Sequence, residues 1–122
     1  MTELPAALRT YLRMWNERDL DRARELLREA VTDDIVFADP QDFHEGREAM
    51  ERNVERFNRA FPGAVLTLAS GVDGQHDRYR YAWNIHVDGE LLIEGFDVST
   101  LAADGRIERV DGFFGPLPAL AE

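Results

Sequence analysis

The sequence predicts an α+β fold in which three N-terminal helices pack on a curved antiparallel sheet. Apolar residues recur at helical spacing in the first half of the chain, and strand-forming runs separated by Asp-Gly pairs fill the second half. Helices first and strands second favour this class over an alternating α/β arrangement. A chain of 122 residues fits one core, so we expect residues 1–122 to form a single domain.

Three apolar stripes predict the helices. Pro5 suits the first turn of one helix, Asp19 is expected to cap the next, and Gly46 precedes the third, which ends at Pro62-Gly63. The stripes are, in order, Leu8, Tyr11, Leu12 and Trp15; Leu20, Ala23, Leu26, Leu27 and Ala30; and Met50, Val54, Phe57 and Phe61.

Five runs predict strands. They span residues 35–38, 65–70, 78–87, 90–101 and 106–114. Asp73-Gly74, Asp88-Gly89 and Asp104-Gly105 separate the last four runs, and Asp-Gly pairs favour tight hairpin turns. We therefore expect these four strands to be antiparallel neighbours, with helices over their concave face and an apolar pocket between the two layers.

Composition and net charge limit the kinds of partner that the protein is expected to bind. The net charge of −10 disfavours nucleic acid and anionic membranes, because both repel an acidic surface. No run of eighteen apolar residues occurs, and Met1–Pro5 lacks the basic and apolar parts of a signal peptide. We expect a cytoplasmic protein that binds neither nucleic acid nor membrane.

The absence of some residue types limits the catalytic mechanisms that are available. The sequence contains no Cys and no Lys, which excludes thiol and Schiff-base catalysis. Its two serines, Ser70 and Ser99, lie outside any nucleophile motif. Carboxylate, His, Tyr and Arg side chains remain as candidates.

Asp39 is the first candidate for a catalytic residue. On the first strand it alternates with Phe37 and Ile35, so it is expected to point toward the helices, where a partly desolvated carboxylate suits proton abstraction. The alternative is that Asp39-Pro40 only starts a turn.

Asp97 is ambiguous. It alternates with Phe96 and Val98, so simple alternation places it on the solvent side with Gly95 and Ser99. That expectation weakens if a second subunit covers the outer face. The run 78–87 has one wholly apolar face and one mixed face that suits a partner.

Two further features have ordinary explanations. Tyr11 lies on a helical stripe, where a core tyrosine is common, although its hydroxyl then needs a polar partner. The cluster Asp39, Asp42, His44 and Glu45 contains a single histidine without metal-ligand spacing, so we predict no metal there. His44 fits better as an acid or base at the pocket rim.

Several short motifs together resemble the nuclear transport factor 2-like superfamily, and more narrowly the ketosteroid isomerases and SnoaL-like polyketide cyclases. The motifs are Trp15-Asn16-x-x-Asp19-Leu20, Asp39-Pro40, Gly46-Arg47 and Asp104-Gly105-Arg106-Ile107. The likeness extends from about Leu8 to Gly115 and implies a cone-shaped fold.

The resemblance implies a site. It implies Asp39 as general base and Tyr11 and Asp97 as donors to an enolate oxygen, which turns Asp97 inward against the alternation. It implies no cofactor. The mixed face of run 78–87 separately favours a homodimer formed through the outer face of the sheet. Residues expected to contact substrate are Trp15, Phe37, His44, Phe57, Phe61, Tyr81, Trp83 and Phe114.

Three departures from the isomerases concern the substrate. Arg28–Val31 lengthens the second helix, residues 41–45 are polar and acidic, and Trp83 is bulky. We therefore expect a ligand smaller than a steroid. Two functions are expected: a cofactor-free isomerase or aldol-type cyclase, or a non-catalytic dimeric module that binds a small apolar ligand. An epoxide hydrolase is more distant, because neither Arg80 nor Arg109 has an evident place between two carboxylates.

Overall fold

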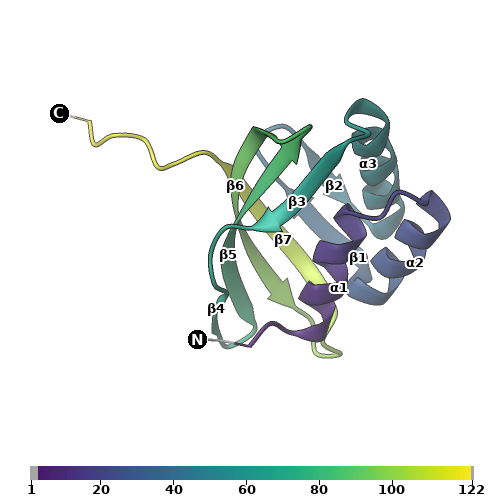
Figure 1. Cartoon of the computed structure of the whole chain (residues 1–122). Helices are drawn as coiled ribbons and strands as arrows, with labels where there is room; N and C mark the ends of the chain where they lie inside the picture. The colour runs from purple at the N-terminus through teal and green to yellow at the C-terminus, as the bar shows by residue number, and fades with distance from the viewer. Residues whose placement is uncertain (1–2, 122) are drawn as a thin grey trace.

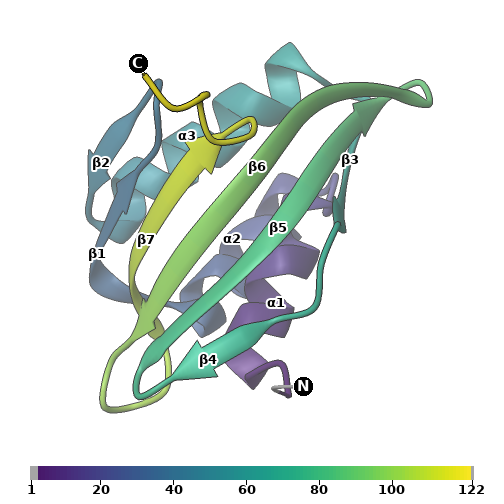
Figure 2. The same ribbon diagram turned by 90° about the vertical axis from the view of Figure 1, so that its left-hand side faces the viewer.

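Three helices lie together against one face of a strongly curved sheet in the computed structural model (Figures 1 and 2). The predicted α+β class is confirmed. The structure describes residues 3–121, so Met1 and Thr2, on which part of the signal-peptide expectation rests, lie outside the described residues. No helix within residues 3–121 has the length and apolarity needed to cross a membrane.

The helices begin where the sequence predicts. They are α1 (Ala6–Trp15), α2 (Leu20–Ala30) and α3 (Arg47–Ala60). The Asp19 carboxylate caps α2 by accepting the backbone N–H groups of Asp21 and Arg22 at 3.0 and 3.2 Å. Gly46, with φ of +93°, makes the left-handed turn into α3, a conformation that glycine adopts without steric cost.

Seven strands form the sheet. They are β1 (Val31–Ala38), β2 (Phe43–Glu45), β3 (Ala64–Leu68), β4 (Asp73–Gln75), β5 (Arg78–Val87), β6 (Glu90–Leu101) and β7 (Ile107–Phe114). Their order is β2-β1-β7-β6-β5-β3, and β4 also pairs with β5. The β1–β7 pair is parallel and the other pairs are antiparallel, so the sheet is mixed but mostly antiparallel.

Two strand predictions were wrong in detail. β1 begins at Val31 instead of Ile35, because Val31 is fully buried and pairs with Ile107 of β7. Asp73-Gly74 lies inside β4 and is not a turn.

The edge strand beside β5 is broken. The Ser70 hydroxyl accepts the Ala82 N–H at 2.8 Å, which continues the hydrogen-bonding ladder between β3 and β4. The turn that follows β4 instead contains His76, with φ of +52°. Asp-Gly pairs are correctly placed in the other two turns, after β5 and β6.

The core lies between the helices and the concave face of the sheet. Leu8 and Met14 of α1 are fully buried there, as are Leu27 of α2 and Met50 of α3. The apolar face predicted for β5 points the same way, with Tyr81, Trp83 and Ile85 buried. The side chains between the two layers leave a cavity, which is the candidate site.

Candidate active site

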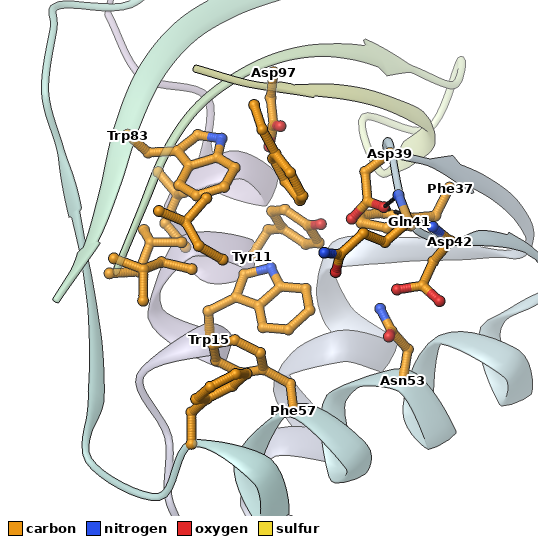
Figure 3. Close-up of a pocket in the computed structure, with 16 residues that line it drawn as sticks. Tyr11, Trp15, Phe37, Asp39, Gln41, Asp42, Asn53, Phe57, Trp83 and Asp97 are labelled. Carbon is orange, nitrogen blue, oxygen red and sulfur yellow. Dashed lines mark hydrogen bonds between the residues drawn. The ribbon is translucent and has the colours of Figure 1, made fainter. Parts of the chain in front are cut away.

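A cavity of ≈ 110 Å³ opens between α1, α3 and the inner face of the sheet (Figure 3). Most of its wall is apolar: Leu12, Trp15, Phe37, Phe57, Phe61, Leu66, Trp83, Ile85, Ile93 and Phe114. Six lining residues are polar: Tyr11, Asp39, Gln41, Asp42, Asn53 and Asp97. All predicted site residues except His44 and Tyr81 line this cavity.

Asp39 lies at the end of β1, with its carboxylate turned toward the cavity (Figure 3). One oxygen, Oδ1, accepts the backbone N–H groups of Gln41 and Asp42 at 2.9 and 2.8 Å. Both interpretations of Asp39 from the sequence therefore apply: it closes a turn and it lines the pocket. The turn fixes the position of the carboxylate that faces the ligand space.

Asp97 points inward and is only 8% exposed. On β6 it shares the buried face with Gly95 and Ser99, while Phe96 and Val98 lie half-exposed on the outer face. The alternation argument was wrong about which face is buried, and the orientation implied by the resemblance is what the structure shows.

Burial controls the ionisation of Asp97. It raises the pKa of the Asp97 carboxyl to about 7, while the nearby Trp83 N–H and Tyr81 hydroxyl act in the opposite direction. Burial, followed by the charge on Asp97, raises the pKa of Tyr11 well above its usual value. Near neutral pH the cavity therefore holds a Tyr hydroxyl and a carboxyl group that is protonated in about half of the molecules, and both can donate hydrogen bonds.

Tyr81 does not line the cavity but lies behind Asp97. It faces Asp97 across the β5–β6 pair and is 1% exposed. Its hydroxyl donates to Asp97 Oδ2 at 3.4 Å and lies 3.1 Å from the Ser99 hydroxyl oxygen. Burial raises the pKa of Tyr81, so it remains a donor. Tyr81, which was predicted to contact substrate, is therefore absent from the cavity wall, and its hydroxyl contacts the Asp97 carboxyl instead.

His44 also lies outside the lining. On β2 it pairs with Phe37, which does line the cavity, and the two rings lie 6.2 Å apart between centroids. His44 Nε2 lies 3.8 Å from Asp42 and 3.4 Å from the Arg56 guanidinium. Among residues 3–121, no three His, Cys, Asp or Glu side chains are placed to hold a metal ion.

Two glycines make room for the site. A Cβ on Gly112 would lie 2.9 Å from Asp97 Oδ1 and 3.5 Å from the Cβ of Asp39. A Cβ on Gly95 would lie 2.0 Å from the Trp83 ring. Glycine at these two positions leaves the space that the Asp97 carboxyl and the Trp83 indole occupy, a feature that sequence reasoning missed.

Gly112→Ala is expected to displace Asp97, because the added methyl group meets its Oδ1 inside a packed layer. Overpacking of this kind destabilises by about 1–3 kcal/mol. Urea unfolding measures the loss of stability. The affinity for phenolates, whose charged oxygen can accept a hydrogen bond from the protonated Asp97 carboxyl, measures the displacement of Asp97. Gly105→Ala is the control for loss of a glycine. Its positive φ strains alanine, but an added methyl group there meets no neighbouring atom, so stability should fall without a change in phenolate affinity. Unchanged phenolate affinity in Gly112→Ala would contradict the placement of Asp97.

Three polar lining residues were not predicted. Gln41 and Asp42 follow Asp39 in its turn, and the Asn53 side chain reaches the cavity from α3. Asn53 is 8% exposed and lies one helical turn before Phe57, on the predicted apolar stripe. A polar residue at that spacing was the signal that could have identified it.

Comparison with known proteins identifies the family. A model of the SnoaL-like domain matches residues 8–110. A search of curated proteins finds no match. A solved structure of a candidate isomerase of the SnoaL-like family from Agrobacterium tumefaciens is 33% identical, with a TM-score of 0.85, over 90% of this chain and 95% of that one.

More distant structures share the fold. A candidate polyketide cyclase from Sinorhizobium meliloti is 21% identical, with a TM-score of 0.73, over 89% of this chain and 94% of that one. An NTF2-like protein from Exiguobacterium is also 21% identical, with a TM-score of 0.76, over 92% and 100% of the two chains. The chain belongs to the SnoaL-like family of the nuclear transport factor 2-like superfamily.

Proposed function

We propose that the chain is a cofactor-free enzyme that moves a proton next to a carbonyl group, as an isomerase or an aldol-type cyclase. The observation that supports this is the meeting of Tyr11, Asp39 and Asp97 in one apolar cavity. The 33% identical structure described as a candidate isomerase is consistent with it.

Three of the polar groups that line the cavity have a chemical role in this proposal. Asp39 removes a proton from the carbon beside the carbonyl and returns it two carbons away, which moves a double bond. Tyr11 and protonated Asp97 donate hydrogen bonds to the enolate oxygen that forms. Such donors act strongly because the apolar wall excludes water.

The cavity limits the substrate to a small molecule. Its volume is ≈ 110 Å³, and an apolar protein cavity of roughly 150 Å³ holds benzene. A ketone with a single ring therefore fits better than a compound with several fused rings.

Proton exchange tests the proposal directly. In D₂O the protein is expected to exchange the α-protons of cyclohex-3-enone well above the buffer rate, measured by NMR, and to convert it to the conjugated isomer. Exchange at the buffer rate, together with tight binding of an apolar ring compound, would instead favour the non-catalytic binding module.

We also propose that a second copy of the chain covers the outer face of the sheet. Phe113 is 60% exposed there, beside the half-exposed Phe96 of the neighbouring strand. Contiguous apolar surface of this kind favours association. Light scattering should give twice the chain mass of 13.9 kDa, and the monomer mass would contradict the proposal.

A further inference from the structure

The Trp83 side chain is held by close packing against Gly95 and Phe114. It extends from β5 across Gly95, its direct partner on β6, where a methyl group would overlap the indole. The Phe114 ring meets it edge-on, with centroids 6.2 Å apart. The indole is therefore fixed in orientation as well as buried, with 7% of its surface exposed.

The indole nitrogen of Trp83 is buried without a hydrogen-bond partner. No acceptor within residues 3–121 meets its N–H with normal geometry. Buried N–H groups in proteins are nearly always paired, and an exception calls for a physical explanation. Because this N–H belongs to a residue that lines the cavity, a ligand acceptor can supply the missing partner.

The unpaired N–H lies beside the proposed enolate donors. Trp83 and Asp97 are diagonal neighbours on the inner face, because Trp83 faces Gly95 and Asp97 comes two residues later on the same strand. Figure 3 shows the indole nitrogen on the side of the ring nearest Asp97. The N–H is close enough to lower the pKa of Asp97, although it makes no regular hydrogen bond to it.

We propose that the indole N–H of Trp83 is a third hydrogen-bond donor of the active site and binds the same ligand oxygen as Asp97 and Tyr11. This rests on the proposed function, because it assumes that the oxygen lies beside Asp97. An oxygen with a full negative charge has enough lone pairs for three donors, so the site selects enolates and phenolates over neutral ketones.

Indole NMR on the unmodified protein tests the third donor. The sequence has two tryptophans, Trp15 and Trp83, and a Trp15→Phe variant assigns the two N–H signals. Binding of 4-nitrophenolate is expected to move the Trp83 N–H proton downfield, and more basic phenolates should move it further. Toluene, which has no acceptor oxygen, should not produce this trend.

The outcomes separate the two proposals. If phenolates bind, as seen in the absorbance of 4-nitrophenolate, but move the Trp83 signal no more than toluene does, the third donor is wrong and the proposed function stands. If no phenolate binds, both are wrong.

A substitution gives a second measurement. Trp83→Phe keeps an aromatic wall and removes the N–H, so the ratio of 4-nitrophenolate to toluene affinity should fall by about tenfold. Phe114→Leu alters the same wall without touching a donor and should weaken both ligands alike. An unchanged ratio in Trp83→Phe would overturn the proposal even if the variant is less stable.

Discussion

Asp39→Asn is expected to lower kcat for α-proton exchange by about 10³-fold while leaving the cavity able to bind phenolates. The Asn amide oxygen can still accept the N–H groups of Gln41 and Asp42, so the turn persists without a proton acceptor. The Asp39 charge also raises the pKa of Tyr11 and Asp97, which means that it opposes a negative ligand beside them. Its removal should therefore tighten phenolate binding, measured by titration, while NMR measures the lost exchange.

Asp111→Asn is the matched control for loss of a negative charge. Asp111 on β7 also raises the pKa of Asp97, but it is paired with Arg109 and does not line the cavity. This variant should keep exchange within about tenfold of the original protein. Exchange retained to the same degree in Asp39→Asn would show that another group is the base.

The fold was largely predictable because its local signals agree with its global arrangement. Helical stripes, the Asp19 cap and two Asp-Gly turns all lie where the pattern placed them. The parallel β1–β7 pair was not predictable, since its partners are separated in the sequence by α3 and five strands and no turn residue specifies such a contact. The break of the edge strand at Ser70 depends on a side-chain hydrogen bond that no pattern shows.

The site was predictable only in part. Asp39 could be placed by alternation, because Ile35 and Phe37 lie on the buried face of the same strand. Asp97 could not, since apolar residues occupy the outer face of β6 and the buried face carries a glycine and a serine instead. Alternation identifies two faces but not which one is buried, and only the resemblance to the isomerases resolved it. Gly112, which makes room for Asp97, carries no sequence signal.

Asp97→Asn is expected to stabilise the protein at pH 8. The carboxyl has a pKa of about 7 when folded and roughly 4 when unfolded, a difference of three units that corresponds to about 4 kcal/mol as an upper bound. Below about pH 4 both states hold the proton and the group costs nothing. As pH rises toward 7 the unfolded state releases its proton first, so folding becomes less favourable. Asn cannot ionise and escapes this loss.

Urea unfolding of both proteins from pH 4 to 8 measures the effect. The free energy of unfolding of Asp97→Asn minus that of the original protein should be smallest at pH 4, grow through pH 7 and then level off. Asp104→Asn is a control of opposite sign, because Arg106 lowers the pKa of exposed Asp104 and stability is lost when that charge is removed. A flat difference curve for Asp97 would mean that its carboxyl is not held neutral by burial. Its proposed role as a donor would then fail as well, because the same desolvation that costs stability keeps the proton on Asp97.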